Sequence, residues 1–125
     1  MAISLVGSAT NNSGTGTSTA PSVTLPGSIA TGNLGVIVLH RNTVDAISAV
    51  PSGWTEHASS PLTNGTVITS HLFTRTLASG DSGASVSATL TTGARYVMQA
   101  IVLSGASTTL SAVGTLQRDR KSTRL

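Results

Sequence analysis

Apolar and polar residues alternate along several short segments, which predicts β-strands. The clearest case is residues 85–90, where Val, Ala and Leu alternate with Ser, Ser and Thr, as in a strand buried on one face. Residues 3–6 and 22–25 alternate more weakly. Residues 34–39 are apolar at both parities, which predicts a central strand or one covered on both faces. No segment carries the apolar stripe of a helix.

Turn residues separate further predicted strands over 54–60, 66–77 and 95–104, with weaker ones near 46–47 and 110–116. The pair Asn64-Gly65 tolerates positive φ and predicts a two-residue type I′ hairpin turn.

Residues 7–20 are rich in Ser, Thr, Asn and Gly, so we expect a loop or a poorly packed edge; a binding loop is the alternative. With this segment set aside, seven or eight short strands remain. They predict an all-β fold, an antiparallel β-sandwich or jelly-roll-like domain over residues 1–118.

Composition narrows the class of protein. Only 9% of the 125 residues are charged, whereas 19 are Ser and 20 are Thr, so hydroxyl groups supply most of the polar surface. The absence of Cys excludes a disulfide scaffold. The net charge of +3 comes largely from residues 119–125, and the other basic residues are scattered, so we expect no nucleic-acid partner. The longest apolar run, 36–39, is far too short to cross a bilayer, so we expect no membrane partner.

Residues that could catalyse a reaction or bind a metal are few and widely spaced. His40, His57 and His71 lack the short spacing of a preformed metal site, so we expect no metal and no cofactor. The segment Gly80-Asp81-Ser82-Gly83 resembles the nucleophile region of trypsin-like serine proteases, but Ala84 replaces the next glycine and the chain is too short for two β-barrels. We interpret the segment as a turn and expect no enzyme.

Four residues are candidates for a ligand or interaction surface: Trp54, His71, Arg75 and Tyr96. Trp54 follows Pro-Ser-Gly at a strand start, which favours a core position over a sugar-stacking platform. His71 and Arg75 share one parity of a strand, so they are expected to face solvent on one side. Exposure of Trp54 or Tyr96 on a concave face would favour carbohydrate binding, and burial of both would oppose it.

The order of motifs in residues 29–105 is distinctive. Gly32-Asn33-Leu34 leads into a strand ending His40-Arg41, and later come Pro51-Ser52-Gly53-Trp54-Thr55, Phe73-Thr74-Arg75-Thr76, Ser79-Gly80-Asp81 and a last strand from Tyr96 to Gly105. This order resembles a β-sandwich module of bacteriophage tail, fibre and other virion-associated proteins. That family usually has Gly-Asp at the first turn and Tyr-Arg-Gly at the end of the last strand, where this chain has Asn33 and Leu103-Ser104. The resemblance implies a structural or adhesive role in a virus particle and no catalytic residues.

The last seven residues, Asp119 to Leu125, resemble one reading frame of a common short-read sequencing adapter. We therefore predict a disordered, non-native tail and a natural chain that continues past residue 118; an ordinary basic tail is the alternative. If later strands are missing, the sheet should show an unpaired apolar edge or an incompletely covered face near Ile101 and Leu103.

These features lead to the expectation of a non-enzymatic virion component made in the host cytoplasm. It would form a homo-oligomer and present its β-surface and loops to other virion subunits, or to a host receptor or glycan. The alternative is a carbohydrate- or ligand-binding β-sandwich module of a bacterial surface protein or enzyme.

Overall fold

Ten strands and one short 3-10 turn form within residues 2–107, the part of the chain that the computed structural model describes. Their bounds are β1 (Ser4–Asn12), β2 (Ser22–Thr24), β3 (Leu34–Arg41), β4 (Ile47–Ala49), β5 (Thr55–Glu56), β6 (Leu62–Asn64), β7 (Ile68–Thr76), η1 (Ser79–Asp81), β8 (Ser85–Ser87), β9 (Thr89–Leu90) and β10 (Tyr96–Ser104). The strand predicted near 110–116 and the tail predicted at 119–125 lie outside the described residues.

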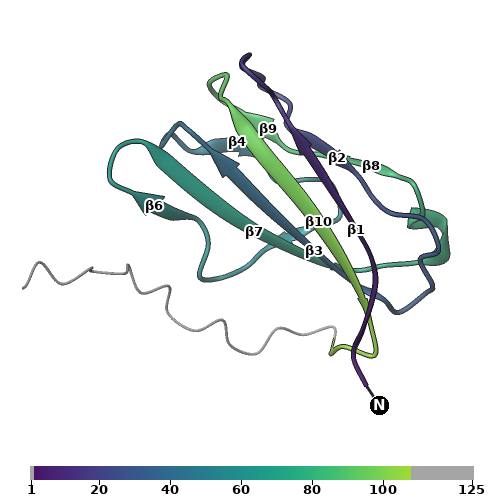
Figure 1. The fold of residues 1–125 in the computed structure, drawn as a ribbon. Helices are drawn as coiled ribbons and strands as arrows, with labels where there is room; N and C mark the ends of the chain where they lie inside the picture. The colour runs from purple at the N-terminus through teal and green to yellow at the C-terminus, as the bar shows by residue number, and fades with distance from the viewer. Residues whose placement is uncertain (1, 108–125) are drawn as a thin grey trace, which may run out of the picture.

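The strands form two layers (Figure 1). One layer is a six-stranded antiparallel sheet in the order β1-β10-β3-β7-β5, with β6 also paired to β7. The other contains two short antiparallel pairs, β2-β8 and β4-β9. The prediction of an all-β antiparallel sandwich is confirmed, and β3 is central in its sheet as its apolar run predicted.

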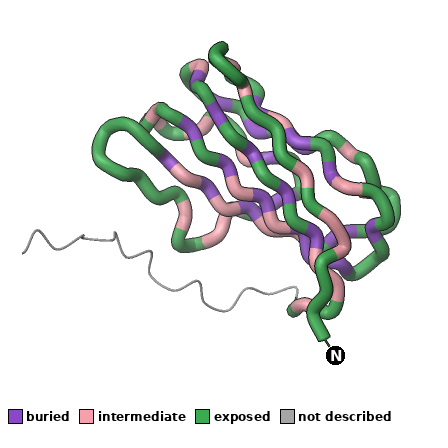
Figure 2. Tube along the Cα trace, in the orientation of Figure 1, coloured by how far each residue is buried: buried purple, intermediate pink, exposed green. Residues whose placement is uncertain are grey.

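The core lies between the layers because each long strand points alternate side chains inward. On β10 the buried residues are Tyr96, Met98, Ala100 and Val102, and their neighbours along the strand are exposed or half-buried (Figure 2). These inward residues join a single hydrophobic cluster with apolar side chains of the second layer and of the connections: Val23, Leu25, Val86, Ala88, Leu90, Trp54 and Leu77.

Three strand predictions need correction. The strand predicted over 3–6 continues through Asn12 as β1, so the first part of segment 7–20 is the poorly packed edge that was one of its two expected forms, paired with β10. The strand predicted over 85–90 divides at Ala88, because β8 pairs with β2 whereas β9 pairs with β4. The strand predicted over 54–60 contains only Thr55–Glu56. The structure consequently has more and shorter strands than the seven or eight expected.

The hairpin at Asn64-Gly65 is present, but its predicted type is wrong. Asn64 pairs with Ile68 as the last residue of β6, so the connection has three residues, 65–67. Only Gly65 has a positive φ, of 62°, whereas a type I′ turn requires positive φ at both central residues.

The predicted unpaired edge near Ile101 and Leu103 is not present, because β10 pairs with β1 on one side and β3 on the other. The edge strand on that side of the sheet is β1. On the outward face of β10, Ile101 is 38% exposed and Leu103 is half-buried.

Candidate functional site

Trp54 and Tyr96 are both buried, with 6% and 8% of their surface exposed. The prediction that Trp54 fills the core is confirmed. The Tyr96 hydroxyl accepts hydrogen bonds from Asn11 Nδ2 (3.2 Å) and the Ser22 backbone N–H (3.4 Å). Neither ring offers a face for stacking on a sugar, so carbohydrate binding through these two aromatic rings is ruled out, and any sugar would have to bind through other groups.

His71 is also buried, at 2% exposure, so the expectation that it faces solvent is wrong. It does share one face of β7 with Arg75, but that face is the inward one, and the His71 ring stacks on Phe73 with centroids 5.7 Å apart. Arg75 lies where this face reaches the surface and forms an ion pair with Asp81 (3.5 Å). Arg75, Asp81 and Trp54 line a small hollow of about 140 Å³.

A buried polar network links His71 to Arg41 and Glu56. Arg41 Nε donates to His71 Nε2 (3.1 Å), so that nitrogen is unprotonated. His71 Nδ1 therefore carries the hydrogen that is donated to Glu56 Oε2 (2.6 Å). Ser60 Oγ also donates to Glu56 Oε2 (2.6 Å) and accepts from the Leu72 backbone N–H (2.9 Å).

The environment keeps this histidine neutral. Burial lowers the pKa of His71, and the charge of Arg41 lowers it further, which outweighs the hydrogen bond and charge of Glu56. Arg41 is held from the other side by Thr43 Oγ1 and by the side chain and backbone carbonyl of Asp45. Arg41 and His71 are thus fully enclosed, and the network serves the core rather than a ligand.

Asp45 completes the network at its outer end. Burial raises the pKa of Asp45, but hydrogen bonds from Thr92, Arg41 and Thr43 and the charge of Arg41 outweigh burial, so the pKa is lower than usual. The carboxylate consequently stays charged opposite Arg41, at 2.9 Å. The sequence carried a weak signal only for Arg41, which ends a strongly apolar strand, whereas β7 around His71 mixes polar and apolar residues.

The protease-like segment is a turn, as the sequence predicted. Ser82 Oγ accepts from the Ile29 backbone N–H (3.0 Å), and Asp81 Oδ2 accepts from the Ala78 backbone N–H (2.8 Å). His40 Nδ1 forms a hydrogen bond with Ser70 Oγ on the neighbouring strand (2.7 Å), and His57 Nδ1 accepts one from the Ser59 backbone N–H (3.1 Å). Within residues 2–107, no three His, Asp or Glu side chains gather in a way that could hold a metal ion.

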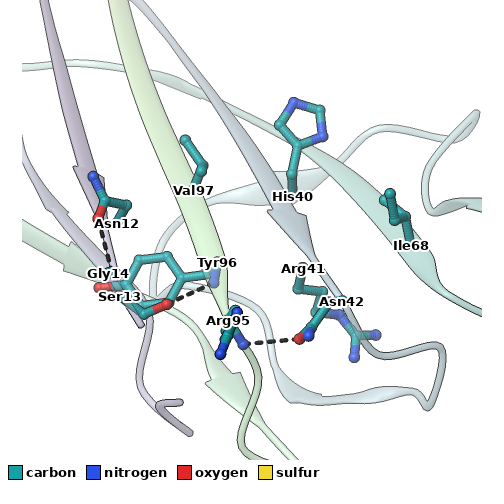
Figure 3. A pocket seen from close by; sticks show the side chains of 10 residues that line it. All are labelled: Asn12, Ser13, Gly14, His40, Arg41, Asn42, Ile68, Arg95, Tyr96 and Val97. Carbon is teal, nitrogen blue, oxygen red and sulfur yellow. Dashed lines mark hydrogen bonds between the residues drawn. The ribbon is translucent and has the colours of Figure 1, made fainter. Parts of the chain in front are cut away.

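An open hollow of about 300 Å³ lies where β1 ends, β10 begins and β3 ends (Figure 3). Its polar lining comes from Asn12, Ser13, His40, Asn42 and Arg95. The Asn42 backbone N–H donates to the Arg95 carbonyl (3.1 Å), and Asn42 Oδ1 accepts from the Arg95 backbone N–H (2.8 Å). Sequence reasoning missed this site, because its residues come from segments far apart in the chain.

The outward surface of the large sheet is a second candidate. Strand register and alternation place many side chains on it, and we call thirteen of those on the four long strands the outer face: Ser8, Thr10, Asn12, Val36, Val38, His40, Ser70, Leu72, Thr74, Val97, Gln99, Ile101 and Leu103. None of them is Asp, Glu, Lys or Arg. The face therefore offers aliphatic, hydroxyl and amide groups and the His40 imidazole, and it contains no carboxylate, ammonium or guanidinium group.

Comparisons with known proteins identify no relative: no family model, no curated protein and no solved structure matches the chain. The residues that the structure describes include no helix long and apolar enough to span a membrane. The outer face and the hollow are therefore the features of the molecule that bear on its function.

Proposed function

We propose that this chain is a non-enzymatic structural module of a virus particle, which packs through its outer face against other subunits, first of all copies of itself. The observation that carries the proposal is the lack of charge on the outer face. The virion setting is supported by the resemblance of residues 29–105 to phage tail and fibre modules.

The composition of the outer face is unusual for a surface that remains in water. Soluble domains carry about 25% charged residues, most of them on the surface. Ile101 in the middle of this face and Val97 near one end are each more than one-third exposed, and Val36, Val38 and Leu72 are half-buried. Depletion of charge around aliphatic residues is the compositional signal of an interface core.

The outer face is large enough for an interface between two copies. Four strands spaced by about 4.8 Å, each about eight residues long at about 3.3 Å per residue, cover about 19 by 26 Å, or about 500 Å². Two such faces together bury about 1,000 Å², which reaches the lower limit for a specific interface. Since the face is uncharged, two copies can meet on it without like-charge repulsion.

The test compares self-association of the full chain with that of two lysine variants, by sedimentation velocity over a wide range of protein concentration. Ile101→Lys places a charge at the centre of the outer face. Val67→Lys is the matched control, because Val67 is 59% exposed in the hairpin loop and lies outside the outer face. We expect the wild type and Val67→Lys to associate and Ile101→Lys to remain monomeric.

Two results would refute the proposal separately. A wild-type chain that stays monomeric at the highest concentrations, or an Ile101→Lys variant that associates like wild type, removes the packing role. A gene neighbourhood without tail, fibre or capsid genes removes the virion setting and leaves the packing role to be judged on its own.

A further inference from the structure

Beyond the packing role, we infer that the hollow at the end of the outer face binds an acidic sugar, with its carboxylate on Arg95 and its ring over Val97. The hollow lies on the outward side of the strands, where Figure 3 shows Arg95 between Tyr96 and Asn42. We argue this from the charge balance of the chain, the polar groups that face the hollow and its size.

Arg95 is the only base in residues 2–107 without an acidic partner. This part of the chain has three bases and three acids. Arg41 pairs with Asp45 and Arg75 pairs with Asp81, and the remaining acid, Glu56, is bonded to His71 and Ser60. The guanidinium of Arg95 is exposed and makes no hydrogen bond or ion pair within the described residues.

These ion pairs and hydrogen bonds also limit which carboxylates are free to bind Arg95. Every acid in residues 2–107 is already engaged, so a second copy offers no free carboxylate from this part of the chain. No Asp or Glu lines the hollow, whereas Arg41, His40 and Arg95 do. Arg41 forms an ion pair with Asp45, whereas Arg95 has no acidic partner within residues 2–107. The hollow therefore favours an external ligand that carries a carboxylate.

The neighbouring polar groups are held in place as hydrogen-bond donors. Asn12 Oδ1 accepts from the Gly14 backbone N–H (2.8 Å), and Asn42 Oδ1 accepts from the Arg95 backbone N–H (2.8 Å). Because each amide oxygen is occupied, each Nδ2 group remains to donate. Neither nitrogen has a partner within residues 2–107. Two fixed amide donors beside a guanidinium suit a ligand that has hydroxyl groups as well as a carboxylate.

Size and shape favour one sugar ring over an acidic peptide. The volume of about 300 Å³ lies at the low end for ligand sites. Val97, 39% exposed, gives the hollow an apolar surface against which the C–H face of a ring can pack, and Ile68, 44% exposed, lies on the far side of His40 (Figure 3). A peptide carboxylate would leave the Asn12 and Asn42 amides without hydroxyl partners.

The experiment titrates the full chain with three small probes, followed by NMR chemical shifts: glucuronate, glucose and acetate. Glucuronate differs from glucose only by its carboxylate, and acetate supplies the carboxylate alone. We expect glucuronate to bind with a Kd of about 1 mM, as suits few contacts in an open site, and at least ten times more tightly than either other probe. Shifts should map to the backbone amides of Gly14, Asn42 and Val97.

Two matched variants locate the site. Arg95→Gln should weaken glucuronate binding at least tenfold, the loss expected for a hydrogen bond to a charged group. Arg75→Gln removes the same charge at the other hollow and should leave the affinity unchanged. The titration is repeated with Ile101→Lys, in which packing through the outer face is disrupted, so failure of the packing proposal and failure of this one can be told apart.

Several results would overturn the inference. No glucuronate binding at tens of millimolar removes the site. Equal binding of acetate and glucuronate reduces it to a general anion site, and equal binding of glucose removes the role of Arg95. Tighter binding of an acidic peptide than of glucuronate replaces the sugar by a protein ligand. An affinity unaffected by Arg95→Gln places any binding elsewhere.

Discussion

Gly35 is the position where the packing of the core can be tested most directly. It lies on the inward face of β3, and a Cβ added there would fall 2.6 Å from Trp54 Cη2 and 3.0 Å from Leu77 Cδ1. Both neighbours are buried, so neither can move away into solvent. Gly35→Ala must therefore shift Trp54 or the strand itself.

The expected loss follows from two opposing effects. Overpacking of a well-packed core costs about 1–3 kcal/mol. Replacing Gly by Ala also restricts the unfolded chain, which returns about 0.4–1 kcal/mol. We expect Gly35→Ala to lower the free energy of unfolding by about 1–2 kcal/mol and the melting temperature by about 4–16 °C.

Gly80 provides the control, because a Cβ added there meets nothing within 4 Å and its φ is not positive. Gly80→Ala should leave the melting temperature unchanged or raise it slightly. Both variants are compared by thermal unfolding, and Trp54, the only tryptophan, reports displacement through its fluorescence.

A double-mutant cycle makes the test specific. Trp54→Phe removes Cη2, so Gly35→Ala should cost less in that background than in wild type. If Gly35→Ala is as stable as Gly80→Ala, or costs the same with and without Trp54, the contact between β3 and Trp54 is not as described.

Three further outcomes are expected. The free energy of unfolding, measured by denaturant titration, should fall as the pH drops below about 6.5. His71 in the unfolded chain is protonated in that range, whereas folded His71, whose pKa is lowered, takes up its proton only at lower pH. A free energy of unfolding that does not change with pH would contradict a neutral buried His71. Tyr96→Phe should cost about 1 kcal/mol, since its hydroxyl accepts from Asn11 Nδ2 and the Ser22 N–H, and an unchanged denaturation midpoint would show that these bonds add nothing. Gly65→Ala should cost about 1 kcal/mol because of the φ of 62°, and a thermal unfolding curve identical to wild type would argue against that turn conformation.

The fold could be predicted from the sequence because its signals are local. Alternation over 85–90, the apolar run 34–39 and the turn residues between segments each depend on only a few neighbours. The errors came where pairing partners decide. Residues 85–90 look like one strand, yet they pair with two different strands, and Asn64 is part of a ladder rather than of the turn. Long-range pairing of this kind leaves no mark in a short window.

The candidate site was harder to predict, because its residues share no motif. Parity correctly placed His71 and Arg75 on one face of β7, but parity alone does not say which face is inward. Arg95 and Asn42 meet only because β3 ends beside the start of β10. A base whose possible acidic partners are all paired elsewhere is a property of the folded chain, and the sequence shows only that residues 2–107 contain three bases and three acids.

The placement of charge also separates the packing role from a solvated surface. Arg41 is enclosed in the core, Arg75 and Asp81 pair at the opposite end of β7 from the hairpin, and Arg95 lies at the rim of the outer face. If the outer face is exposed to water, Ile101→Lys should be tolerated, because an exposed charge on a sheet face costs little stability and improves solubility. If the face is an interface, the same lysine must be buried without a partner, because no acid lies on the opposing copy of the face. One substitution therefore has opposite consequences under the two interpretations: unchanged association in the first, and loss of association in the second.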